Sequence, residues 1–190
     1  MTVTDVNVVK SAIFERPDDA NKGTLGSLLC VCGSYGMAGA AVMSAKGALR
    51  TGIGLAKCAL PRSIYPIVAQ TILESVYYPL SENADGRISK VNVPFLVSES
   101  CKSSATLVGC GLGVCDDTLK IVFSLIENST TPLVLDADAL NCVAKQPEIL
   151  LRKKAPIIIT PHPGEMSRLT GLATPPVSYT HLTLPTKRIV

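Results

Sequence analysis

A histidine held between two prolines has the setting that most clearly points to chemistry. The string TPHPGE occupies residues 160–165 and contains His162, one of only two histidines in the chain. Proline fixes its own backbone angle, so the two prolines restrict the direction of the His162 side chain and favour a role in binding a ligand. A helix that begins near Pro163 would carry Glu165 in its first turn, where the helix dipole stabilises a carboxylate. Packing of His162 and helix capping by Glu165 are the structural alternatives.

Two carboxylates follow a short apolar run at residues 132–135. The string LDADALN, residues 135–141, contains Asp136 and Asp138. A charge at the end of a buried strand is costly unless it has a partner, so we expect both carboxylates to be engaged. One of them would cap the helix that follows. Asp136 is the candidate for binding the hydroxyl groups of a ligand.

Two glycine-rich segments have the composition of turns that approach a ligand. Residues 33–39, GSYGMAG, and residues 109–113, GCGLG, each lie between a predicted strand and a predicted helix, where backbone N–H groups can hold an anion. Ala40 and Ala41 follow the first segment with small side chains that leave room for a ligand. The first segment is neither a P-loop nor the G-x-G-x-x-G dinucleotide fingerprint. A tight turn that binds nothing would use the same glycines.

The elements that must position these strings follow from the hydrophobic pattern. Apolar runs predict strands at residues 27–32, 54–60, 105–110, 132–135 and 156–160, and helices are predicted at residues 38–51 and 116–128, the second capped by Asp116 or Asp117. Short strands that alternate with small-residue helices predict an α/β fold with a mostly parallel sheet. All four strings follow a strand, at the sheet edge where ligands bind in such folds. Tyr77 and Tyr78 beside Pro79 indicate an edge strand, and residues 85–87 indicate a turn.

The composition excludes several classes of protein. The chain has 190 residues, which suits one domain, and its 47% hydrophobic and 17% charged residues are typical of elements covered on both faces. A net charge of +3 without a basic stripe, and only 4% aromatic residues, predict no nucleic-acid partner. Residues 24–45 carry no charge, but glycines interrupt the stretch, so we expect no membrane span.

The cysteines indicate a reducing compartment. There are seven of them, an odd number, and no C-x-x-C pair that would suit zinc or redox exchange. We therefore expect reduced thiols rather than disulfides or a metal site. The first residues carry an acid and lack an apolar core segment, so no secretory signal is predicted. These features together predict a cytoplasmic protein.

Taken together, six segments resemble the ADP-dependent NAD(P)H-hydrate dehydratases of the ribokinase-like superfamily. They are NKG at 21–23, GSYGMAGAA at 33–41, RTGIG at 50–54, VGCGLG at 108–113, LDADALN at 135–141 and ITPHPGEMSRLTG at 159–171. The resemblance implies a three-layer α/β/α sandwich with a mostly parallel central sheet. The hydroxymethylpyrimidine and hydroxyethylthiazole kinases share that architecture and are the alternative. A dinucleotide-binding fragment without catalysis is a further alternative.

The resemblance also implies an activity and a site. Enzymes of this family restore hydrated NADH or NADPH to the normal cofactor, with ADP and magnesium as cofactors and with AMP and phosphate released. By resemblance, Ala40, Gly111 and His162 contact the hydrated dinucleotide and Asp136 lies beside it. Glu165 would lie near a magnesium-bound water. The family further implies a homo-oligomer when the domain is complete.

The sequence departs from the family pattern at several points. Cys110 stands where the family usually has proline, and Asn21 stands where it usually has histidine. The family's lysine-glycine loop for the adenylate and its G-T-G-D segment, which carries the expected catalytic aspartate, do not follow Thr174, so the catalytic residue is unknown. We expect residues 1–20 to be an N-terminal helix or linker and 21–176 a partial ribokinase-like domain, incomplete at its C-terminus. Residues 177–190 would be a non-native tail, and the chain an inactive fragment.

Overall fold

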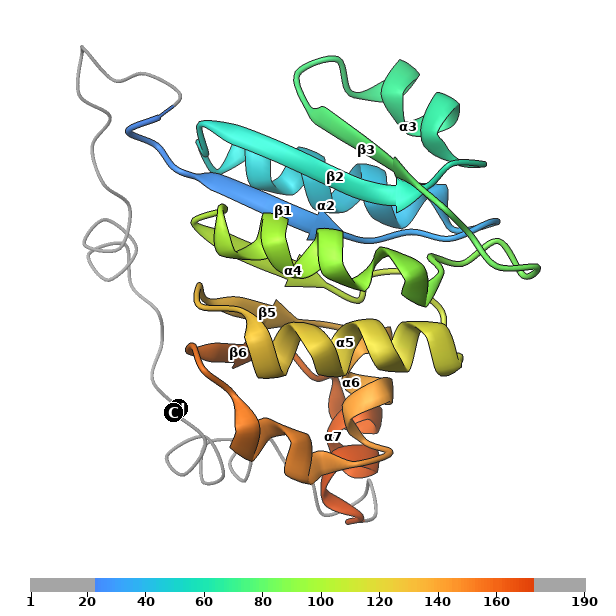
Figure 1. Ribbon diagram of the computed structural model, residues 1–190, viewed down its shortest axis with the longest axis vertical. Helices are drawn as coiled ribbons and strands as arrows, with labels where there is room; N and C mark the ends of the chain where they lie inside the picture. The colour runs from blue at the N-terminus through green and yellow to red at the C-terminus, as the bar shows by residue number, and fades with distance from the viewer. Residues whose placement is uncertain (1–22, 173–190) are drawn as a thin grey trace.

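A six-stranded sheet forms the centre of the molecule (Figure 1). The computed structural model describes residues 23–172, so the predictions for residues 1–20, Asn21 and the tail lie outside the described residues. The strand order is β3-β2-β1-β4-β5-β6, and all five neighbouring pairs are parallel. The strands are β1 (Ser27–Val31), β2 (Leu55–Pro61), β3 (Val76–Leu80), β4 (Ala105–Val108), β5 (Leu133–Leu135) and β6 (Ile157–Ile159).

Helices cover both faces of this sheet, which gives the expected three-layer α/β/α sandwich. Figure 1 shows α4 (Val93–Cys101) and α5 (Asp116–Asn128) in front of the sheet and α2 (Ala38–Arg50) behind it. The remaining helices are α3 (Tyr65–Thr71), α6 (Asp138–Val143) and α7 (Pro163–Thr170), with the 3-10 helices η1 (Lys90–Asn92) and η2 (Pro147–Arg152). Among the described residues, no helix combines the length and the apolar content needed to cross a bilayer.

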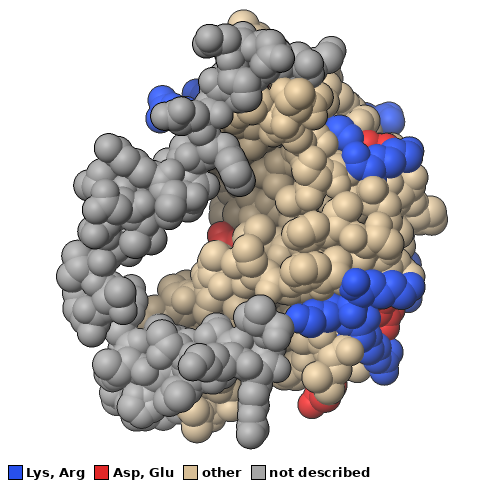
Figure 2. Space-filling model, turned by 90° about the vertical axis from the view of Figure 1, so that its left-hand side faces the viewer, with Lys and Arg blue, Asp and Glu red and all other residues tan. Residues whose placement is uncertain are grey.

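The central strands are mostly apolar because each of their faces lies under helices. In β1, Leu29 and Val31 join the core cluster beneath α4 and α5, whereas Cys30 joins a second cluster with α2 and α3. Continuous apolar runs of this kind are typical of parallel strands. Lys57 in β2 is an exception, and its ammonium lies 3.5 Å from the carboxylate of the buried Glu99. On the face at the amino ends of the strands, Lys and Arg side chains lie in separate groups rather than in a continuous stripe (Figure 2).

The predicted elements agree with the structure, whereas the predicted cap of α5 is wrong. Helix α5 occupies the predicted residues, and β3, which contains the two tyrosines, lies at the edge of the sheet as expected. Neither Asp116 nor Asp117 caps α5, because Cys115 is the N-cap and forms a capping box with Thr118. Asp117 instead accepts hydrogen bonds from the Asn83 side chain, at 2.9 Å, and from the backbone N–H of Lys90, at 3.2 Å.

At the end of β4, the backbone of Gly109 lies so close to the loop after β5 that a side chain at this position would not fit. A Cβ atom on Gly109 would lie 1.9 Å from the carbonyl oxygen of Asp136 and 2.7 Å from the backbone nitrogen of Ala139. The φ angle of Gly109 is +122°, which side-chain-bearing residues rarely adopt. The absence of a side chain at Gly109 therefore lets the loops after β4 and β5 meet.

We expect Gly109→Ala to lower the free energy of unfolding by roughly 2 to 4 kcal/mol, because it adds backbone strain to an overpacked contact. Gly52→Ala is the matched control, since Gly52 has a φ of +95° and a Cβ atom there would meet nothing within 4 Å. Strain alone should cost that variant about 1 kcal/mol. Urea unfolding followed by circular dichroism measures both. Equal losses at the two positions would contradict the close contact at Gly109.

Candidate functional site

The four strings singled out in the sequence converge at the carboxyl edge of the sheet. The loops after β1 and β4 are joined by a hydrogen bond from the backbone N–H of Gly33 to the carbonyl oxygen of Cys110, at 2.9 Å. The buried hydroxyl of Ser34 donates a second hydrogen bond, 2.8 Å long, to the carbonyl oxygen of Gly111. Both glycine-rich segments are therefore held as one surface.

Two of the predicted ligand-binding residues, Ala40 and Gly111, are in contact. A Cβ atom on Gly111 would lie only 2.6 Å from the Cβ atom of Ala40, and the φ of Gly111 is +65°. Ala40 belongs to the first turn of α2, so its methyl group lies directly against the GCGLG turn. Small residues at both positions keep the backbone near this helix terminus open to another molecule.

The N-terminus of α2 is electrostatically suited to an anion. It has no side-chain cap and no acidic residue in its first turn. The helices α5, α6 and α7, which also begin at the carboxyl edge, each carry an acid in their first turn. Because unsatisfied N–H groups and the helix dipole favour negative charge, the α2 terminus is the one beside Gly111 where a phosphate group would be stabilised.

The two carboxylates of LDADALN hold neighbouring loops together. Asp136 accepts a hydrogen bond from the Thr160 hydroxyl at 2.8 Å and one from the Cys110 thiol at 3.3 Å. Asp138 accepts one from the backbone N–H of Gly113 at 2.8 Å. The loops after β4, β5 and β6 thereby share one polar network.

The expectation that one of these carboxylates caps α6 is wrong. The N-cap of α6 is Ala137, and it makes no side-chain capping bond. Its φ of +48° makes it the one non-glycine residue with positive φ in the described range 23–172. Such a conformation costs about 1 to 3 kcal/mol and persists only where surrounding contacts enforce it, as the bonds of Asp136 and Asp138 do here.

His162 and Glu165 form a capping box at the start of α7. The Nδ1 atom of His162 accepts a hydrogen bond from the N–H of Gly164 at 3.0 Å, and Glu165 accepts one from the N–H of His162 at 3.0 Å. The Nε2 atom of His162 lies 3.2 Å from the Glu165 carboxylate. The helix begins at Pro163, as predicted, and Glu165 is buried in its first turn. The His162 ring, with 60% of its side chain exposed, can offer its face and edges to a ligand.

The structure thus connects the predicted residues in two groups. Ala40, Gly111 and Asp136 belong to the network around the GCGLG turn, and the capping pair of His162 and Glu165 begins two residues after Thr160. Sequence reasoning missed Arg87, whose Nε atom would lie 2.4 Å from a Cβ atom on Gly113. Arg87 belongs to a hairpin that is closed by a bridge between Glu82 and Ile88, and from there it reaches the GCGLG turn. No local sequence signal could have revealed this contact.

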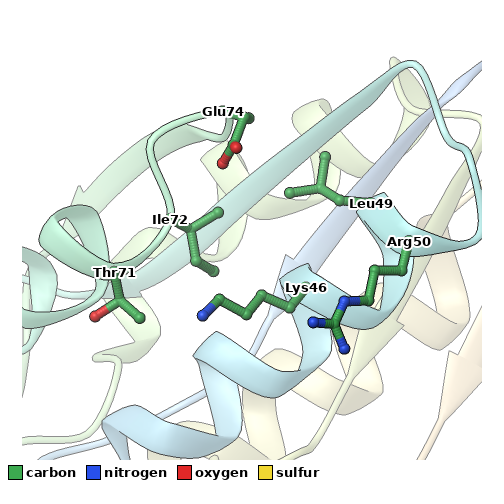
Figure 3. Close-up of a pocket in the computed structure, with 6 residues that line it drawn as sticks. All are labelled: Lys46, Leu49, Arg50, Thr71, Ile72 and Glu74. Atoms are coloured by element: carbon green, nitrogen blue, oxygen red, sulfur yellow. The ribbon is translucent and has the colours of Figure 1, made fainter.

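A hollow at the opposite edge of the sheet lies apart from this network. It is lined by the C-terminal end of α2, which contributes Lys46 and Arg50, and by the end of α3 with the residues that follow it, including Glu74 (Figure 3). Lys46 and Arg50 are both exposed. None of the residues predicted to bind a ligand lines it.

The fold and the site define a class: α/β sandwich proteins with a ligand site beyond the carboxyl ends of parallel strands. Comparison with known proteins identifies the family within that class. The chain belongs to the NAD(P)H-hydrate dehydratase family, which it matches over residues 28–183.

Individual relatives agree with this assignment. The chain is 38% identical over 156 residues to the bifunctional NAD(P)H-hydrate repair enzyme Nnr of Thermofilum pendens, covering 82% of this chain and 30% of that protein. It is 29% identical over 166 residues to the ADP-dependent (S)-NAD(P)H-hydrate dehydratase of Bacillus subtilis, covering 86% and 54%. The chain thus spans from 30% to 54% of the length of these relatives.

Solved structures show the same architecture. A Bacillus subtilis ADP/ATP-dependent NAD(P)H-hydrate dehydratase, co-crystallised with ATP and Mg²⁺, matches with a TM-score of 0.68 at 27% identity, covering 96% of this chain and 58% of that one. A hypothetical protein from Streptococcus mutans matches with a TM-score of 0.83 at 24% identity, covering 98% and 64%. The second likeness concerns the fold alone.

The capping box predicts how substitutions at His162 affect stability. His162→Ala removes the acceptor for the Gly164 N–H and should lower the free energy of unfolding by about 1 kcal/mol. His162→Asn keeps a capping oxygen and should retain most of the wild-type stability. Thermal unfolding followed by circular dichroism compares the two. If Asn and Ala destabilise equally, the imidazole does not act as a helix cap.

Proposed function

We propose that this chain forms the dinucleotide-binding part of an ADP-dependent NAD(P)H-hydrate dehydratase. In the proposed reaction, hydrated NADH or NADPH loses water to become the normal cofactor while ADP is converted to AMP and phosphate. Membership of the family supports the reaction class. The observation that carries the proposal is the contact between Ala40 and Gly111, which joins the unblocked α2 terminus to the GCGLG turn.

The geometry supports a different role in ligand binding for each of the site residues. A phosphate of the dinucleotide would lie at the first turn of α2, next to Ala40, where the dipole and free space favour it. Asp136, tied to Thr160 and Cys110, would present its carboxylate to a ligand hydroxyl. His162 would contact the ligand through the exposed surface of its ring, because both ring nitrogens face partners within α7.

The chemistry requires positioning more than covalent participation by the protein. Hydroxide is a poor leaving group, whereas a phosphorylated ring hydroxyl can be expelled by the neighbouring enamine nitrogen. Transfer of that phosphoryl group from ADP depends on alignment and charge stabilisation. Residues that hold the hydrated ring in one orientation, as proposed for this edge of the sheet, therefore contribute directly to the rate.

The resemblance implied that Glu165 lies near a magnesium-bound water, and the described residues offer the ion no ligand set of their own. Residues 23–172 contain no group of three His, Cys, Asp or Glu side chains arranged to hold a metal ion. The carboxylate of Glu165 is buried and faces the backbone N–H and Nε2 of His162. We therefore derive no step through magnesium, and ADP binding stays a part of the proposal that rests on the family.

The proposal includes a cytoplasmic location and self-association. All seven cysteines are free, which is typical of a reducing compartment and supports the location. Self-association rests on the family resemblance. The substrate partner is a small molecule, the hydrated dinucleotide.

Binding of (S)-NADH hydrate to the whole chain, measured by isothermal titration calorimetry, tests the proposal. Ala40→Leu should weaken this binding at least about tenfold, because the larger side chain occupies the space beside Gly111 and a poorly paired ligand phosphate costs more than about 1 kcal/mol. Ala48→Leu, the same change at the far end of α2, is the control and should bind like the wild type. If the Ala40 variant binds the hydrate as tightly as the wild type does, the binding site does not lie at the glycine turns.

A further inference from the structure

Four cysteines gather on the α2 side of the sheet, close to the candidate site. Cys30, Cys32 and Cys58 are buried in the core cluster beneath α2 and α3, and Cys110 is partly exposed and packs against that cluster. No metal-binding group occurs among the described residues 23–172, so these thiols are not arranged as a ligand set. Nothing in the proposed dehydration uses their sulfur chemistry.

Two of these cysteines, Cys32 and Cys110, lie just beyond the ends of the adjacent strands β1 and β4. In the register of β1 and β4, Val31 pairs with Val108, so the residues that follow also run side by side. The N–H of Gly33 donates to the carbonyl of Cys110 at 2.9 Å, which fixes the backbone immediately after Cys32 against Cys110. Both side chains belong to the α2 side of the sheet. The two thiols are therefore neighbours that originate 78 positions apart in the chain.

Their environments differ in a way that gives them different reactivities. The interaction with the neighbouring Cys32 thiol lowers the pKa of Cys110 below its ordinary value, although burial and Asp136 oppose this effect. The same interaction, together with burial, raises the pKa of Cys32. The Cys110 thiol also donates a hydrogen bond to Asp136 at 3.3 Å, which holds its side chain at the candidate site. The thiolate is the reactive form, and Cys110 is the more accessible of the two sulfurs.

We propose that Cys110 is a site of oxidation by hydroperoxides and that Cys32 resolves it into an intramolecular disulfide. In the first step the Cys110 sulfur attacks hydrogen peroxide, the O–O bond breaks, and a sulfenic acid and one water form. In the second step the Cys32 sulfur attacks that of Cys110, the S–O bond breaks, and a second water carries away the Cys32 proton. Two thiols lose two electrons and one peroxide gains them.

The disulfide would act on the candidate site through the GCGLG turn. Bonding to the buried sulfur of Cys32 draws the Cys110 side chain inward and removes its hydrogen bond to Asp136. The adjacent Gly111 carries the contact with Ala40 and accepts the bond from Ser34. The oxidised chain therefore differs from the reduced chain at the surface where the dinucleotide is proposed to bind.

Peptide mapping of the peroxide-treated full chain tests the proposal. Tryptic peptides 23–46 and 103–120 each contain two cysteines, so the background variant Cys30→Ala with Cys115→Ser leaves one thiol in each. Serine retains a capping oxygen at position 115. Under non-reducing conditions, we expect the two peptides to appear crosslinked after peroxide and to separate after dithiothreitol. Adding Cys32→Ser to this background should abolish the crosslink and leave Cys110 as a sulfenic acid trapped by dimedone.

Several results would overturn the inference. One is that the two peptides do not crosslink in the background variant. Another is that dimedone labels Cys101 in preference to Cys110 in the Cys32→Ser variant. Circular dichroism and thermal unfolding show whether each variant is folded, so that a missing crosslink is interpreted only for a folded variant. In wild-type chain, a crosslink that joins Cys115 to Cys142 instead would equally contradict the assignment.

A protection experiment links the thiol pair to the proposed function, on which this step rests. Saturating (S)-NADH hydrate should slow the peroxide-driven crosslink, because the ligand would cover the turn that contains Cys110. A crosslink that forms at the same rate with and without the hydrate would support the thiol pair and contradict the proposed ligand position. Slower crosslinking with the hydrate than with the same concentration of AMP supports both.

Discussion

The close approach of backbone segments at the end of β4 is the constraint on which the rest of the site depends. Gly109 lets the loop after β5 come within van der Waals distance, and Gly111 lets α2 do the same from the other face. The missing side chains at Gly109 and Gly111 bring the loops after β4 and β5 and the start of α2 into one surface. The hydrogen bonds that join the loops after β1, β4 and β5 are made around these close contacts.

The polar groups at this edge are satisfied mostly by one another. Asp136 and Asp138 take donors from Cys110, Thr160 and Gly113, and Ser34 bonds to the carbonyl of Gly111. Partnered carboxylates at strand ends avoid the large cost of burying an isolated charge. The arrangement differs at α2, whose first turn has neither an acid nor a side-chain cap. This helix terminus, which has no such internal compensation, lies beside the small residues Ala40 and Gly111.

The fold was largely predictable from the sequence, because parallel strands and their helices are encoded by local hydrophobic runs. The limits of α5 and the start of α7 at Pro163 followed from such local signals. The caps were not predictable in the same way. An aspartate near a helix start suggests a cap, but Asp117 instead binds Asn83 of a distant hairpin and the backbone of Lys90, which follows that hairpin. Arg87 reaches Gly113 from the same hairpin, and no pattern within either segment encodes that contact.

The hydrogen bonds at the carboxyl edge follow an unbroken path from one side of the sheet toward the other. Gly33 binds Cys110, Cys110 binds Asp136, and Asp136 binds Thr160, so the loops after β1, β4, β5 and β6 are linked in the order of their strands. A displacement of any one loop must break or stretch a bond to the next. We therefore expect local unfolding at α7 to loosen the linked loops as far as the start of α2, even though the two helices lie over different strands.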